Sequence, residues 1–374
     1  MKTIVSVTTP KQLKLFIDFP HDLYSKDPNY VPELFIAQRD LLTPGKHPFH
    51  EHSQLQAFLA YDNNKVVGRI AAILNNNHNT FNKANDGFWG FFDCVDDKEV
   101  AKLLFDAAEK WLKEKGTATS IGPVNFSTNE ACGLLVDGFD SPPRAMMTYN
   151  SPYYLHLIEN EGYKKRTDIF AYDFDLSAYK DERLKKMTAI IKERLDRRGI
   201  VIRPINLKNF KEEVTKVREV YNSAWDKNLG FVPMTDKEFD YLAKDLKMIL
   251  DKDFCMVAEH NGKFVGFSLA IPDINQVLIK IKRGRLLPTG IFKLLSQKSK
   301  IKAIRIITLG VIEGYRKSGI EQFFYSSIIK NVEEKKMKNA EASWVLEENL
   351  LMNKAITEIN GKPYKRYRIL EKAI

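Results

Sequence analysis

One stretch of this sequence occurs twice, and the repeat constrains the fold more than any other feature. Residues 57–73 read AFLAYDNNKVVGRIAAI and residues 255–271 read CMVAEHNGKFVGFSLAI, without a gap, at an offset of 198 residues. In each copy a two-residue turn, Asn63-Asn64 or Asn261-Gly262, separates two apolar runs. This pattern predicts a β-hairpin. The chain is therefore expected to be a duplicated fold.

The length and composition fit two ordinary globular domains. A chain of 374 residues can bury two separate cores, and fractions of 44% hydrophobic and 28% charged residues are typical of a soluble protein. The N-terminal residues lack the pattern of a signal peptide, and no apolar run is long enough to span a bilayer. We expect a cytoplasmic protein without a membrane partner.

The three cysteines predict neither a disulfide framework nor a metal site. Cys94, Cys132 and Cys255 are isolated, with no CxxC pair and no nearby histidine. We expect them to be buried thiols without a chemical role.

The net charge of +10 is concentrated in one segment. Residues 274–312 contain no acidic side chain. Its nine cations are Lys280, Lys282, Arg283, Arg285, Lys293, Lys298, Lys300, Lys302 and Arg305. Such a segment can attract an anionic ligand, contact a membrane or nucleic acid, or form a solvated face. One hypothesis is that residues 274–305 form a lid that guides an anionic cofactor or substrate.

Hydrophobic periodicity predicts the same order of elements in both halves. In the first half, strands are expected at 88–95, 145–149 and 169–174, and a helix at 96–115. In the second half, strands are expected at 200–202, 304–311, 342–346 and 364–370, and helices at 209–225, 236–250, 320–337 and 349–359. The fold class is α/β (α+β), with a mixed, mostly antiparallel sheet flanked by helices. The predicted domains are 1–178 and 200–374, joined by a connecting helix at 179–199.

The second half carries a candidate anion site. The strand at 304–311 leads through Glu313-Gly314-Tyr315-Arg316-Lys317-Ser318-Gly319 into a helix. The start of a helix directs backbone N–H groups and the positive end of the dipole at one spot, which suits a pyrophosphate. Gly319 allows close approach of the backbone, and Arg316 and Lys317 add positive charge.

This order of elements resembles the GNAT superfamily of acyl-CoA-dependent N-acyltransferases. The phosphate loop of that family is written (Q/R)-x-x-G-x-(G/A), and here it reads Arg316-Lys317-Ser318-Gly319-Ile320-Glu321. The first two fixed positions match, whereas Glu321 replaces a small residue. The resemblance covers both halves in element order and only the second half in this motif.

The resemblance implies a cofactor site for acetyl-CoA or another acyl-CoA. Leu309 and Val311 would offer strand backbone to the pantetheine arm. Residues 316–321 would hold the pyrophosphate, and Asn349 would contact the cofactor from the other side of two splayed strands.

Acyl transfer to an amine needs a base for the amine and an acid for the leaving thiolate. Glu313, Glu347 and Glu348 are the candidate bases, because they lie at the ends of the two strands that would flank the thioester. The family's usual acid is a tyrosine, and Thr357 stands at its expected place. Tyr315 and Tyr325 are the nearby substitutes in sequence.

The first half does not match the phosphate loop of the family. Asp96, Asp97 and Glu99 surround the start of its helix, and no glycine is present there. These carboxylates would cap the helix and repel a pyrophosphate. We interpret this copy as a scaffold, or as one wall of a substrate pocket, with a degenerate cofactor site.

The leading hypothesis is a tandem GNAT N-acetyltransferase that uses acetyl-CoA and a primary amine, either a small molecule or a peptide, with the cofactor in the C-terminal domain. One alternative is a non-catalytic acyl-CoA-binding or assembly protein. Another is an aminoacyl-tRNA-dependent peptidyltransferase, although the aromatic residues typical of RNA contacts are absent, so we do not expect a nucleic-acid partner. A homodimer is left open.

Overall fold

The computed structural model describes residues 1–176, 182–224 and 231–374. The N-terminal half contains these strands: β1 Lys2–Ser6, β2 Gln54–Asp62, β3 Lys65–Leu74, β4 Asp86–Cys94, β5 Thr119–Gly122, β6 Val124–Asn125, β7 Ser127–Cys132, β8 Leu134–Asp137 and β9 Lys164–Asp175. Its helices are α1 Pro10–Leu23, α2 Phe35–Leu42, α3 Asn76–Asn82, α4 Lys98–Glu114 and α5 Tyr154–Asn160.

The C-terminal half repeats this plan. Its strands are β10 Ile200–Pro204, β11 Cys255–His260, β12 Lys263–Pro272, β13 Ala303–Val311, β14 Asn339–Leu346 and β15 Lys362–Ala373. Its helices are α6 Glu182–Arg197, α7 Phe210–Ala224, α8 Asp236–Ile249, α9 Asn275–Leu278, α10 Gly290–Gln297, α11 Ile320–Glu334 and α12 Leu350–Glu358. None of the helices in the described ranges is both long and apolar enough to cross a bilayer.

The repeated hairpin is confirmed down to its backbone irregularities. Asn63 and Asn64 both have positive φ, as do Asn261 and Gly262, which is the geometry of a type I′ turn. The register shifts after Ala60 in the first hairpin and after Ala258 in the second, again 198 residues apart. The two halves therefore share a fold as well as a sequence pattern.

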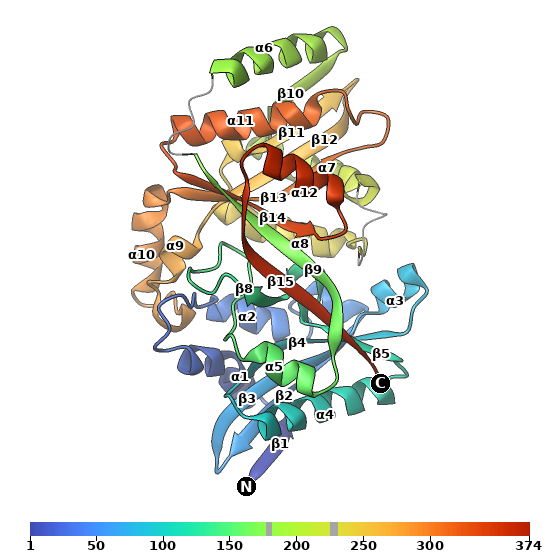
Figure 1. Ribbon diagram of the computed structural model, residues 1–374, viewed down its shortest axis with the longest axis vertical. Coiled ribbons are helices and arrows are strands. Elements are labelled where there is room, and N and C mark those ends of the chain that lie inside the picture. The colour runs from blue at the N-terminus through green and yellow to red at the C-terminus, as the bar shows by residue number, and fades with distance from the viewer. Residues whose placement is uncertain (177–181, 225–230) are drawn as a thin grey trace.

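One mixed sheet runs through both halves, as Figure 1 shows. Its order in the described residues is β1-β2-β3-β4-β5-β15-β9-β14-β13-β12-β11-β10, and β8 also pairs with β15. Only β4 with β5 and β13 with β14 pair in parallel; the other pairings are antiparallel. The predicted fold class is confirmed. The predicted strand at 145–149 is wrong, since these residues form turns and irregular backbone.

The last strand of each half lies in the sheet of the other half. β15 pairs with β5 of the N-terminal half, whereas β9 pairs with β14 of the C-terminal half, and β9 and β15 pair with each other. In Figure 1 these two long strands cross the middle of the molecule, and the C-terminus lies beside β5. The predicted boundary at 179–199 stays a prediction, because the hydrogen-bonded sheet continues across it.

A buried ion pair joins the two exchanged strands. Arg368 on β15 donates from Nε and Nη2 to the carboxylate of Asp168 on β9, at 2.8 and 3.0 Å. The Asp168 side chain is 3% exposed. Burial would raise the pKa of Asp168, but the hydrogen bonds from Arg368 and Lys165 outweigh burial and hold the pKa below its ordinary value.

Replacing Arg368 by Met should lower the free energy of unfolding by about 3 kcal/mol at neutral pH, because a buried carboxylate loses its bidentate partner. Since the folded pKa of Asp168 is depressed, the stabilisation is present above the unfolded pKa and disappears as the pH falls through the folded pKa. Urea unfolding at several pH values measures the difference between wild type and variant.

Arg166→Met is the matched control. Arg166 pairs with Glu371 across the same two strands, but both side chains are substantially exposed. We expect a change below about 1 kcal/mol for such a pair. Equal losses for the two variants, or an Arg368→Met loss that is unchanged in acid, would contradict the role given to Asp168.

Candidate functional site: two splayed strand pairs and the cavities between them

Strands β13 and β14 run together only at their start. Their pairing extends from Ala303 with Asn339 to Ile306 with Ala342, and no further pair joins them in the described residues. Beyond this point β13 stays with β12, and β14 stays with β9. The strands therefore splay apart, and the edge of β13 from residue 307 onward faces the opening.

A cavity of about 260 Å³ occupies this opening. It is lined by Ile307 and Thr308 of β13, by Trp344 and Leu346 of β14, and by apolar side chains of α7 and α8. Its described lining contains no Asp, Glu, Lys, Arg or His. We call it the apolar cavity.

The predicted phosphate loop leads from the outer end of β13 into α11. Gly319 has a φ of 107° and stands at the N-cap, where no side chain caps the helix. Ser318 is buried, and its Oγ has no hydrogen-bond partner among the described residues. Arg316 donates from Nε to the Val311 carbonyl at 3.2 Å, so part of its guanidinium is held against the strand end.

The remaining residues of the loop have distinct surroundings. Lys317 is exposed, whereas the Ile320 side chain is fully buried in the core beneath α11. Oε2 of Glu321 is buried without a hydrogen-bond partner in the described residues. Tyr325 lies one turn further along α11, and burial, assisted by the charge of Glu321, raises its pKa to about 12. The cofactor roles of this loop stay predictions.

The candidate catalytic residues fall into two groups that the fold does not bring together. Glu347 accepts hydrogen bonds from the Asp168 backbone N–H at 2.9 Å and from Lys165 Nζ at 2.7 Å. Glu348 accepts from the Thr167 hydroxyl at 2.8 Å. Both carboxylates are thus held against β9, at the end of β14 next to the apolar cavity.

The other group follows the carboxyl end of β13, on the other arm of the splay. Glu313 is exposed in the turn after that strand. Tyr315 forms a 2.7 Å hydrogen bond with Nδ1 of His260, which is in the repeated hairpin. About six residues of extended chain, roughly 20 Å, separate Glu313 from the point where β13 leaves β14. Asn349 caps α12 by accepting from the Met352 N–H.

The N-terminal half has the same splay and a different helix start. β4 and β5 pair only from Asp86 with Thr119 to Phe88 with Ile121. At the start of α4, Asp97 accepts from the backbone N–H groups of Glu99 and Val100, at 2.9 and 3.2 Å. The ammonium group of Lys2 also forms salt bridges with the carboxylates of Asp97 and Glu99. These contacts use the N–H groups and the cation at the start of α4 internally. The degenerate cofactor site stays an interpretation.

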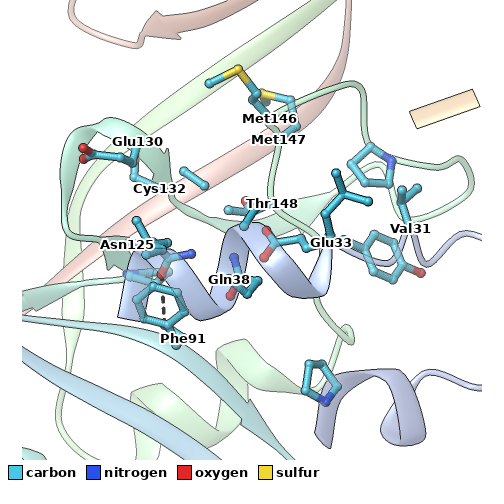
Figure 2. A pocket seen from close by; sticks show the side chains of 18 of the residues that line it. Val31, Glu33, Gln38, Phe91, Asn125, Glu130, Cys132, Met146, Met147 and Thr148 are labelled. Carbon is cyan, nitrogen blue, oxygen red and sulfur yellow. Dashed lines mark hydrogen bonds between the residues drawn. The ribbon is translucent and has the colours of Figure 1, made fainter. Parts of the chain in front are cut away.

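A cavity of about 400 Å³ opens at this second splay. Phe91 of β4 and Asn125 of β6 line it from the N-terminal half (Figure 2). Glu238 and Leu242 of α8 line it from the C-terminal half. We call it the interdomain cavity. It adjoins the apolar cavity, because both are lined by Asn129, Cys132, Met146, Met234 and Leu242.

No family model matches the chain. Two known proteins nevertheless align with nearly all of it. Bacterial ceramide synthase from Caulobacter vibrioides is 35% identical over 382 residues, covering 100% of this chain and 97% of that protein. Protein YghO from Escherichia coli is 36% identical over 373 residues, covering 97% and 93%. The chain belongs to the family of these two proteins.

Solved structures confirm the predicted tandem GNAT fold. The tandem GNAT protein from the clavulanic acid biosynthesis pathway superposes with a TM-score of 0.59 at 11% identity, covering 100% of this chain and 98% of that chain. A GCN5-related N-acetyltransferase from Sphaerobacter thermophilus gives a TM-score of 0.53 at 13% identity, covering 99% and 95%.

Two carboxylates that line the interdomain cavity were not predicted from the sequence. Glu130 accepts from the backbone N–H and the hydroxyl of Ser127, at 3.0 and 2.6 Å. Burial raises the pKa of Glu130 to about 7. Glu33 is the next-to-last residue of the proline-containing run at residues 27–34, whose extended or turn backbone is the one sequence signal that could have found it.

The segment of residues 274–305, which carries the nine cations, connects the two halves of the chain. Arg285 donates to Asp18 of α1 at 2.8 Å and lies 3.3 Å from the centre of the Phe35 ring. Arg283 binds Asp22 of the same helix. Ile274 and Leu278 line the interdomain cavity. Two of the cations considered for a lid are therefore paired with acidic residues of the N-terminal half.

Glu130→Gln should make stability less dependent on pH. Because the pKa of Glu130 rises from 4.5 to about 7 on folding, the folded protein binds more protons, and the wild type loses up to about 3 kcal/mol between pH 5 and pH 8. The variant should lack this loss. Urea unfolding at both pH values measures it.

Glu114→Gln, an exposed change on α4, is the control and should follow the wild type. If the stability of Glu130→Gln changes with pH in the same way as that of the wild type, the Glu130 carboxyl does not titrate near neutral pH.

Proposed function

We propose that this protein is an N-acyltransferase that transfers a long-chain acyl group from acyl-CoA to an amine that carries a hydrocarbon chain of its own. The observation that carries the proposal is the apolar cavity at the splay of β13 and β14. The relative from Caulobacter vibrioides is named a ceramide synthase. This name supports the proposal, because ceramide is the amide of a fatty acid and a long-chain amino alcohol.

The apolar cavity suits a hydrocarbon chain rather than an acetyl group. A cavity of about 260 Å³ far exceeds the space that two carbon atoms need. Each methylene moved from water into such a site contributes about 0.8 kcal/mol. Acetyl-CoA, the donor expected from the sequence, stays a prediction.

The donor is proposed to enter from the start of α11. The uncapped N–H groups at Gly319 and beyond and the positive end of the helix would hold its pyrophosphate. The pantetheine arm would follow the open edge of β13 past Val311 and Leu309. The acyl chain would then occupy the apolar cavity.

In the transfer step the amine nitrogen attacks the thioester carbonyl carbon, so that a C–N bond forms and the C–S bond breaks. The amine gives up a proton, and CoA leaves as a thiolate that takes up a proton. Glu347 directly follows the cavity residue Leu346, which makes it the best placed of the predicted bases. The catalytic roles of Glu313, Glu348 and Tyr315 stay predictions.

Wild-type protein incubated with palmitoyl-CoA and sphinganine should release CoA and form one amide per CoA released, measured by thiol titration and mass spectrometry. Acyl-CoA binding without CoA release would favour the non-catalytic alternative. Absence of acyl-CoA binding by calorimetry would remove the proposal.

Gly319→Val should weaken acyl-CoA binding about tenfold or more. The φ of 107° disfavours a β-branched residue, and a Cβ would meet Ile191 at 3.1 Å. Gly314→Val is the matched control, since Gly314 has a φ of 91° in the same loop but open space around it. Equal affinities for the two variants by calorimetry would place the cofactor elsewhere.

Ala243→Phe should shift the preferred donor to shorter acyl chains. Ala243 lines the apolar cavity, so the larger ring would take the place of the chain's far end. We expect kcat/KM for palmitoyl-CoA to fall at least tenfold relative to hexanoyl-CoA. Ala355→Phe, an exposed change on α12, should leave the ratio unchanged. An unchanged ratio for Ala243→Phe would mean that the chain binds outside this cavity.

A further inference from the structure

Glu33 lines the interdomain cavity with a carboxylate that the described residues do not pair. Figure 2 shows the side chain of Glu33 extending into the cavity on the side of Gln38 and Thr148. No hydrogen bond or salt bridge to this carboxylate is found among the described residues. The side chain is exposed to the space of the cavity, so an entering ligand can reach this carboxylate, and its negative charge favours a cationic group.

The other charged groups of the lining are already accounted for. Arg69 and Asp93 form a salt bridge of 2.7 Å. Glu238 binds His52 and caps its own helix. Glu130 is held by Ser127, and Figure 2 shows its carboxylate turned away from Glu33. Asp245, at the exposed rim, is beside the charge of Lys244.

Burial raises the pKa of Glu33 above its ordinary range, although the charge of Arg69 opposes this effect. A cation beside Glu33 would relieve that cost. The described lining contains no Lys, and its one Arg is bound to Asp93. A cationic partner for Glu33 would therefore come from outside the chain.

Polar groups near this carboxylate suit a ligand that also carries hydroxyl groups. Gln38 and His21 are both less than one-tenth exposed and line the cavity. Oε1 of Gln38 and Nε2 of His21 have no hydrogen-bond partner in the described residues. The remaining wall is largely aromatic and aliphatic, including Tyr24, Tyr30, Phe91, Phe92, Leu134 and Leu278.

Charge is thus segregated between two adjoining cavities. The described lining of the apolar cavity has no charged residue, whereas the interdomain cavity exposes the unpaired carboxylate of Glu33. Met146 and Cys132 belong to both walls, so ligands in the two cavities would meet there.

We propose that the interdomain cavity is the acceptor site, in which the Glu33 carboxylate binds the ammonium group of a long-chain amino alcohol and the aromatic wall holds its chain. This inference rests on the proposed function and extends it. The half that lost the cofactor site has kept the splay of its strands as a binding site for the second substrate.

Calorimetry without acyl-CoA tests the site directly. The probes are sphinganine and the same diol without its amino group, each delivered from cyclodextrin. Wild type should bind sphinganine about tenfold or more tightly than the diol, as expected for a hydrogen bond to a charged group. Glu33→Gln should lose this preference while its affinity for the diol stays unchanged. Glu114→Gln should keep the preference.

Equal affinities of the wild type for the two probes would overturn the proposal, and this measurement does not depend on the folding of any variant. Parallel losses for both probes in Glu33→Gln would also overturn it, since they would indicate a structural role. Failure of the proposed function can be distinguished from failure of this inference. If the protein binds sphinganine through Glu33 but neither binds acyl-CoA nor releases CoA, the amine site stands and the transferase assignment is wrong.

Discussion

The exchange of β9 and β15 is the interaction on which the rest of the structure depends. Each half of the duplication completes its sheet with the last strand of the other half, and the buried Asp168–Arg368 pair joins the two strands. The halves cannot separate without exposing both strand edges. Because their positions are fixed in this way, the two splays open toward each other, and residues of both halves line the interdomain cavity.

Duplication followed by divergence explains the contrast between the two helix starts. Both halves keep the hairpin, the parallel strand pair and the splay that follows it. In the first copy Asp97 and Lys2 use the helix start for internal contacts. In the second copy Gly319 leaves it uncapped. The chemistry proposed for the protein follows from this difference: a donor enters one splay, and an amine binds at the other.

Turns and helices that depend on residues close together in the sequence were predicted correctly. The turns at Asn63 and Asn261 and the apolar stripe of α4 determine their elements through contacts a few residues apart. The strand exchange was not predictable, since any strand of suitable pattern can pair with β5 or with β14. The predicted strand at 145–149 failed for a related reason: Ala145 is buried against residues of the other half, and Met147 is buried in a cluster drawn from both halves, rather than by a ladder. Glu33 was missed because an unpaired carboxylate is recognisable only when its surroundings are known.

A crystal structure of the protein with a non-hydrolysable palmitoyl-CoA analogue and sphinganine would test the central claim most directly. The account predicts the acyl chain between β13 and β14, the pyrophosphate at the start of α11, and the ammonium group beside Glu33. A pyrophosphate at the start of α4, or both hydrocarbon chains in one cavity with Glu33 still unpaired, would contradict it.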